Sequence, residues 1–163
     1  CELLKKCKTH FMMMNMSDAT SVQRELQEVK IILNKLLSRT KKEKLNEAWF
    51  ESFLFSIFFQ DCKIKQQKKI HETVKKNDRR TATKLDLFIE TIDRCFVFEE
   101  TLEMKSANAA LHKLIKKSYH IEATKSNKPY LLIGIKVDED EDGIVNISMS
   151  YLCNTFEGKG EDV

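Results

Sequence analysis

The sequence predicts an α/β fold of the α+β type, built from two helices, three strands, a further helix and two more strands. Three observations support this class. Apolar residues recur at helical spacing in the first third of the chain, and later stretches are rich in β-branched and aromatic residues. Only 4 of the 163 residues are glycine and 1 is proline, which argues against a sandwich built from many tight turns. A few long elements around one core are therefore expected.

The first clear helix is expected at residues 21–38. Ser21 is the expected N-cap, and the apolar positions follow at steps of four, three, four and three residues: Val22, Leu26, Val29, Leu33 and Leu36. The methionine-rich residues 1–16 are interpreted as either a helix or a packing strip. Residues 1–45 together are interpreted as an N-terminal helical extension.

The main domain is expected to span residues 46–152 and to open with an apolar helix over 46–60. Alternation, caps and chain breakers predict the other elements: strands 62–74, 85–92 and 95–102, helix 106–118, a buried central strand 130–137 and a last strand 144–152. Asp93 and Arg94 are expected to form a two-residue turn, and the first three strands a three-stranded antiparallel meander. Residues 153–163 are expected to be a flexible tail.

The net charge of +3 comes from 28 basic and 25 acidic residues, which is too even to indicate a nucleic-acid partner by itself. The distribution is uneven, because residues 63–80 are strongly basic and residues 138–142 are wholly acidic. No apolar run reaches the ~20 residues that a membrane-spanning helix needs, so a membrane protein is not expected.

The five cysteines form no closely spaced pair, and Cys62 and Cys95 lie within apolar patterns. Buried free thiols in a reducing, cytoplasmic compartment are the expected interpretation, which makes the protein intracellular. A zinc site from Cys1, Cys7 and His10 would lack a fourth ligand at the usual spacing. A lipid-modified N-terminal cysteine is not supported either, because no signal segment is visible.

Two carboxylates are expected on one face of the predicted hairpin. With the two-residue turn, facing residues have numbers that sum to 187, so Asp86 lies opposite Thr101 and Glu99 lies one diagonal step away. Adjacent carboxylates repel unless a cation lies between them, and Mg²⁺ is the cation that takes such ligands together with water and phosphate oxygens. The alternative is that both side chains lie at strand ends and face water.

These features resemble the PD-(D/E)XK nuclease superfamily, in particular the nuclease-like domain that accompanies AAA-type ATPase proteins. The family shows an opening-helix Glu, a Gly-Arg-x-Asp strand, a Phe-Glu-x-Lys strand, an Ala-Leu-x-Gln-Ile-x-x-Lys-x-Tyr helix and an apolar strand with Gly. Here the matching segments are Thr83 to Asp86, Phe98 to Thr101, Ala110 to Tyr119 and Leu131 to Ile135. The resemblance implies a restriction-endonuclease-like core over more than half of the chain.

The resemblance assigns roles residue by residue. Glu47, Asp86 and Glu99 would bind Mg²⁺, and Asp86 and Glu99 would be catalytic. Thr101 stands where the family has its catalytic Lys, and Thr cannot supply a positive charge. Lys113 replaces the family's Gln, which faces the active site, so Lys113 is the first candidate to supply the missing amine. Weaker candidates are Lys84 and Lys105, and for each of the three lysines the alternative is a surface residue.

Two functions remain open from the sequence. The first is a degenerate nuclease that binds DNA or RNA, with or without Mg²⁺-dependent phosphodiester hydrolysis. Its nucleic-acid contacts would come from Lys63, Lys65, Lys84, Lys117 and Tyr119. The second is a catalytically inactive pseudonuclease that binds a protein partner through the 21–38 helix. In either case we expect the chain to be a piece of a longer multidomain protein.

Overall fold

The computed structural model describes residues 2–38, 40, 47–59, 87–102, 106–116, 125, 127–155, 159–160 and 163. The helices are α1 (Glu2–Met13), α2 (Ala19–Leu37), α3 (Glu47–Phe59) and α5 (Ala107–Lys116). The strands are β1 (Leu87–Glu90), β2 (Cys95–Thr101), β3 (Tyr130–Glu139), β4 (Val145–Cys153) and β5 (Lys159–Gly160). The predicted strand 62–74 lies outside the described residues.

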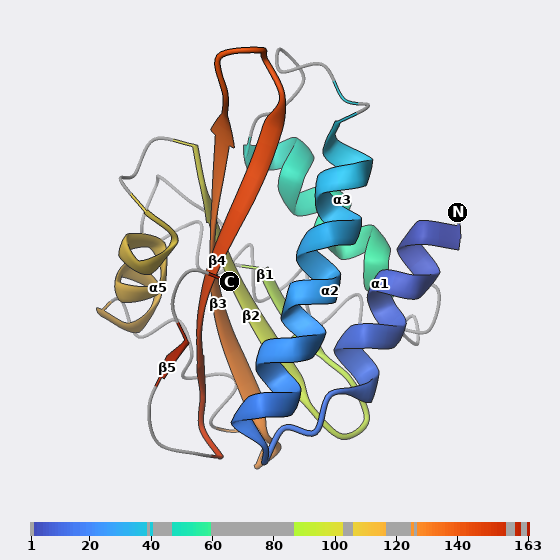
Figure 1. The fold of residues 1–163 in the computed structure, drawn as a ribbon. Coiled ribbons are helices and arrows are strands. Elements are labelled where there is room, and N and C mark those ends of the chain that lie inside the picture. Colours follow the sequence, from blue (N-terminus) through green and yellow to red (C-terminus); the bar gives the residue numbers. More distant parts are fainter. Residues whose placement is uncertain are drawn as a thin grey trace.

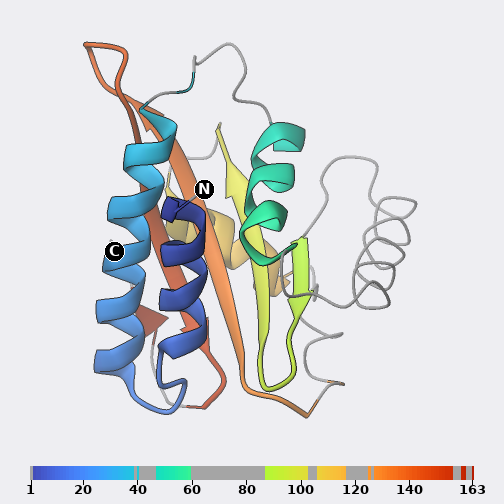
Figure 2. The ribbon, with the colours of Figure 1, turned by 90° about the vertical axis from the view of Figure 1, so that its right-hand side faces the viewer.

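One mixed sheet forms the centre of the fold, with strand order β1-β2-β3-β4-β5. Strands β2 and β3 are parallel, and the other neighbouring pairs are antiparallel. Parallel neighbours need a crossover connection, and α5 lies in that connection between β2 and β3. Helix α5 covers one face of the sheet, whereas α1, α2 and α3 cover the other (Figure 1; Figure 2). The predicted α+β class, with helices packed on a sheet, is confirmed.

The larger core lies between the sheet and helices α1, α2 and α3. Phe11 of α1 packs at ring-centroid distances of 5.2 Å from Phe58, 5.2 Å from Phe96 and 5.8 Å from Phe98. The N-terminal helices and the sheet therefore share one continuous core. The domain boundary expected at residue 45 stays a prediction, but the described residues on its two sides pack against each other.

The N-cap of helix α2 lies three residues earlier than expected, because Asp18 caps the helix and accepts a hydrogen bond from the backbone N–H of Thr20. The hydroxyl of Ser21, the expected cap, instead accepts a hydrogen bond from the N–H of Asn15. The apolar face of α2 is buried as the spacing predicts. Its side chains also reach β4, where the carboxamide oxygen of Asn34 accepts a hydrogen bond from the N–H of Ile147.

The β1–β2 hairpin differs from its prediction in register. The observed partners, such as Leu87 with Phe98 and Glu90 with Cys95, have numbers that sum to 185 rather than 187. The turn lies one residue earlier than expected: β1 ends at Glu90, β2 begins at Cys95, and the N–H of Thr91 donates to the carbonyl of Arg94, so Ile92 and Asp93 lie at its centre instead of Asp93 and Arg94. A shift of two residues leaves every side chain on its expected face.

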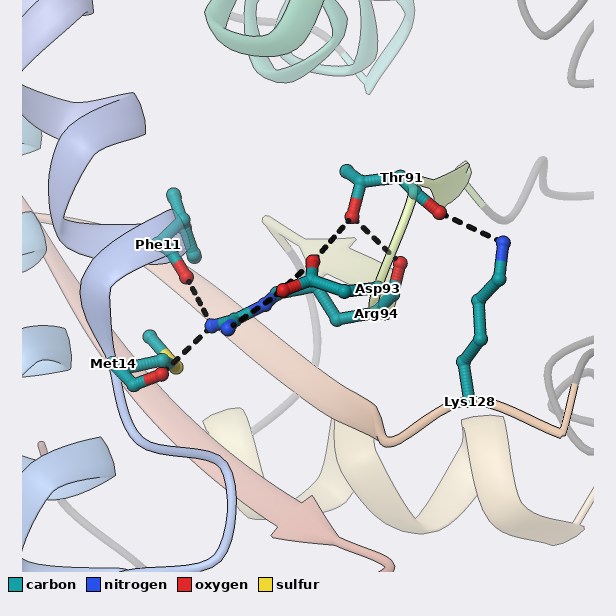
Figure 3. A network of polar contacts seen from close by, with 6 residues as sticks. All are labelled: Phe11, Met14, Thr91, Asp93, Arg94 and Lys128. Atoms are coloured by element: carbon teal, nitrogen blue, oxygen red, sulfur yellow. Dashed lines mark hydrogen bonds and ion pairs between the residues drawn. The ribbon is translucent and has the colours of Figure 1, made fainter.

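A polar network fixes this hairpin turn to α1 (Figure 3). The Nη1 atom of Arg94 donates to the carbonyl oxygens of Phe11, at 3.2 Å, and Met14, at 2.7 Å. On its other side the guanidinium binds the Asp93 carboxylate, and the hydrogen bond from Arg94 lowers the pKa of that carboxyl. Arg94, expected only as one of the two turn residues, thus satisfies carbonyl groups at the C-terminal end of α1.

The described positions of the tail expected to be flexible make backbone contacts with β4. Lys159–Gly160 pairs with β4, and Val163 is buried and exchanges two backbone hydrogen bonds with Met149. These contacts cover the outer edge of β4, which would otherwise expose unpaired backbone groups. Such edge pairing uses the backbone and leaves little trace in the side-chain pattern, and the flexibility of residues 153–163 stays a prediction.

Among the described residues, no helix is both long enough and apolar enough to cross a membrane. Cys7, Cys95 and Cys153 are buried and form no disulfide, as was expected for Cys95, while Cys62 lies outside the described residues. Burial raises the pKa of the Cys7 thiol to about 12, so this thiol stays protonated at neutral pH. Cys7 and His10 are both part of α1, and no cluster of three or more metal-binding side chains occurs in the described part of the chain.

Candidate functional site

The candidate site lies on the α5 face of the sheet, near the C-terminal end of β2. Side chains alternate along β2, so Cys95 and Val97 join the small core under α5 and Glu99 and Thr101 continue the same face. Glu99 is only 1% exposed and Thr101 is fully buried. An anionic group is thus placed in the interior of the fold, where it requires a compensating charge or hydrogen bonds.

Lys113 supplies that compensating charge from α5. Its Nζ atom lies 2.9 Å from Oε1 of Glu99, and the Lys113 side chain is 14% exposed. Sequence reasoning expected this lysine to face the site, and the structure brings its amine to Glu99. A catalytic role for the pair stays a prediction.

Two features of the sequence place Lys113 over Glu99. Ser106 caps α5, since its hydroxyl accepts a hydrogen bond from the N–H of Ala109. Gly134 of β3 is the register partner of Glu99, and its missing side chain lets the first turns of α5 approach the sheet closely. The helix therefore presents Lys113 to the strand position beside Gly134.

The second carboxylate oxygen of Glu99 distinguishes this pair from a fully satisfied ion pair. Oε2 is buried and has no hydrogen-bond partner within the described part of the chain. A buried acceptor left in this way is unfavourable by roughly 1–3 kcal/mol. Carboxylate oxygen is the donor type that Mg²⁺ prefers, so the chemistry of this atom fits a divalent cation.

The other expected ligands and contacts cannot be placed beside it. Glu47 is the first residue of α3, and its side chain is not described. The remaining predicted site residues lie outside the described residues: Asp86 as a metal ligand, Lys63, Lys65, Lys84, Lys117 and Tyr119 as nucleic-acid contacts, and Lys105 as a substitute amine. Of the predicted site, the structure therefore shows the part formed by Glu99, Thr101 and Lys113.

Lys136 was missed by sequence reasoning. It is the register partner of Thr101 on β3, and alternation places it on the same face as Gly134. Its Nζ atom donates to the carbonyl of Leu102 at 2.7 Å and lies 3.6 Å from Asp138 Oδ1. The available signal was a single charge inside the apolar run 130–137, which a buried strand does not contain without a specific partner.

Comparisons with protein-family models, with curated proteins and with solved structures find no match for this chain.

Proposed function

We propose that the chain carries a degenerate nuclease-like domain of PD-(D/E)XK type, which binds DNA or RNA at the Glu99–Lys113 site and cleaves phosphodiester bonds with Mg²⁺. The observation that carries the proposal is the buried contact of 2.9 Å between the Lys113 amine and the Glu99 carboxylate. An acid and an amine held together in the interior are the pair that this resemblance requires, and here the amine comes from a helix instead of position 101.

The order of elements also supports the proposal. A helix, an antiparallel hairpin, a crossover helix and a parallel strand follow one another as α3, β1, β2, α5 and β3. This is the order that a restriction-endonuclease-like core implies. The third strand of the expected meander falls at 62–74, outside the described residues.

At this site, the described residues offer Oε2 of Glu99 to a cation. The resemblance adds the carboxylates of Glu47 and Asp86 as further ligands. A Mg²⁺ ion bound there would polarise the phosphate and lower the pKa of a bound water. The amine of Lys113 would orient a phosphate oxygen or a water molecule by donating a charge-assisted hydrogen bond, and it would supply the positive charge that Thr101 lacks.

The test is a cleavage assay on labelled single-stranded DNA, duplex DNA and RNA of one sequence, with Mg²⁺ or with EDTA. We expect metal-dependent products from the full chain and a loss of roughly 10²–10³ in rate for Glu99→Gln and Lys113→Gln. Lys116→Gln is the matched control. Lys116 is exposed on the last turn of the same helix, so this variant should cleave at the rate of the unaltered chain. Circular dichroism would verify that each variant is folded.

Either of two results would overturn the nuclease proposal. One is cleavage that persists unchanged in Glu99→Gln and Lys113→Gln. The other is a folded chain that neither cleaves nor binds any of the three substrates at ~50 mM salt, where phosphate contacts are strongest.

A second candidate function is a pseudonuclease that binds another protein, favoured by Thr101 at the position of the family's lysine. The structure limits how the 21–38 helix could serve this purpose. The apolar face of α2 is already buried against the rest of the fold, so a partner would meet its polar outer face and Ile31, which is 48% exposed. Replacing Ile31 with Glu would then weaken partner binding and leave nucleic-acid binding unchanged.

A further inference from the structure

The Glu99–Lys113 pair is electrically balanced without any bound ion. Both side chains are largely withdrawn from water, with 1% and 14% of their surfaces exposed. At 2.9 Å from Oε1, the ammonium group supplies the counter-charge that the buried carboxylate needs. A cation that enters this site therefore meets a positive charge already in place.

The two oxygens of Glu99 are in different situations. Oε1 accepts the hydrogen bond from Lys113, whereas Oε2 is buried and has no hydrogen-bond partner among the residues that the structure describes. The second oxygen attracts a cation, and the nearby ammonium group repels it. The affinity for a cation is the difference between these two effects, and the repulsion depends on one side chain.

We propose that Lys113 competes with a divalent cation for Glu99 and thereby sets the affinity of the site. This inference rests on the cation site of the proposed function and adds its regulation. In the absence of the ion, Lys113 holds the carboxylate in place through the 2.9 Å contact. When a divalent ion binds Oε2, the ammonium group opposes it, so the ion binds weakly unless an anion such as a phosphate group enters with it.

Electrostatics predicts the direction and the minimum size of the change in cation affinity when the Lys113 charge is removed. Charges a few ångströms apart interact appreciably even at the effective dielectric constant of ~20 that suits partly buried groups. Removing the Lys113 charge while keeping Glu99 should therefore tighten divalent binding by about tenfold or more. Removing the charge of Lys116, which is exposed and screened by solvent, should change it by less than about twofold.

The experiment titrates Mn²⁺ into the full chain and follows the free ion by its electron paramagnetic resonance signal. The variants are Lys113→Gln, Lys113→Arg, Lys116→Gln and Glu99→Gln. We expect Lys113→Gln to bind Mn²⁺ at least about tenfold more tightly than the unaltered chain, and Lys113→Arg and Lys116→Gln to bind as the unaltered chain does. Glu99→Gln should lose the site.

The thermal melting temperature gives a second measurement. Lys113→Gln leaves Glu99 buried without its counter-charge, so this variant should melt at a lower temperature and recover when Mn²⁺ is added. If Lys113→Gln stays unfolded both with and without Mn²⁺, the ion does not replace the ammonium group and the inference is wrong.

The remaining outcomes separate this inference from the proposed function. If the unaltered chain binds Mn²⁺ through Glu99 but Lys113→Gln binds it equally or more weakly, the competition fails and the cation site stands. If neither the unaltered chain nor Lys113→Gln binds Mn²⁺, the cation site itself fails, and the inference fails with it.

Discussion

Glu99 and Gly134 are register partners on the parallel strands β2 and β3, so the buried acid lies beside a residue without a side chain. A Cβ atom on Gly134 would lie 2.4 Å from the carbonyl oxygen of Ala107 and 2.5 Å from the backbone nitrogen of Leu111. Helix α5 therefore rests on bare backbone at this point. This close approach brings Lys113 within hydrogen-bond reach of Glu99.

Gly134→Ala is expected to destabilise the fold and to separate Lys113 from Glu99. Both clashing atoms belong to the α5 backbone, so the helix must move as a unit; overpacking of this kind costs ~1–3 kcal/mol and occasionally more. Urea unfolding should report the loss, with Ser148→Ala on neighbouring β4 as a mild control. A Gly134→Ala variant as stable as the unaltered chain would contradict the close packing of α5.

A double-mutant cycle on Glu99 and Lys113 tests their energetic coupling. Lys113→Met alone should cost ~3–5 kcal/mol because it leaves a buried carboxylate without its partner. The double variant, which combines Glu99→Leu with Lys113→Met, should recover most of that loss, since an apolar pair needs no counter-charge. Chemical unfolding of the four proteins measures the coupling. Additive losses would show that the two groups do not interact in solution.

The sequence predicted elements well wherever side-chain pattern decided the outcome. The structure has the elements that three such patterns predicted: the helical spacing in α2, the apolar run of β3 and the Ser106 cap of α5. What could not be predicted depends on backbone geometry. The position of the hairpin turn before Cys95 and the pairing of Val163 with Met149 are set by main-chain hydrogen bonds, which no residue pattern records.

The candidate site was predictable only in part, for a related reason. Lys113 was expected near Glu99 because it replaced a residue that faces the site in a similar family, and not because of any local pattern. Lys136 carried a weak signal, a charge inside an apolar strand, but its partners are the carbonyl of Leu102 and the carboxylate of Asp138. Contacts of this kind follow from the register of β2 and β3, which the sequence alone does not state.

Phe11→Ala tests whether the N-terminal helices belong to the same folding unit as the sheet. Phe11 is 1% exposed and contacts Phe58 of α3 and the two phenylalanines of β2, so its loss should cost ~3–5 kcal/mol. Met13→Ala on the same helix is the control, because Met13 is 72% exposed and should change little. Calorimetry should show one transition that shifts as a whole. A separate, unshifted transition of the sheet would support an independent extension over residues 1–45.

The Asp93–Arg94 contact predicts how stability depends on pH. The hydrogen bond from Arg94 lowers the pKa of Asp93 below its ordinary value of 3.8, so the folded state favours the carboxylate. The contribution of this carboxylate to the stability of the fold is therefore fully present above pH 3.8 and is lost as the pH falls through the lower pKa of the folded state.

Asp93→Asn should reduce stability at pH 7, and the stability difference between this variant and the unaltered chain should shrink at acid pH. Urea unfolding at several pH values measures this, with Glu141→Gln on the exposed β3–β4 turn as the control. A stability difference between Asp93→Asn and the unaltered chain that stays constant down to the lowest pH would show that the Asp93 charge does not support Arg94 at the end of α1.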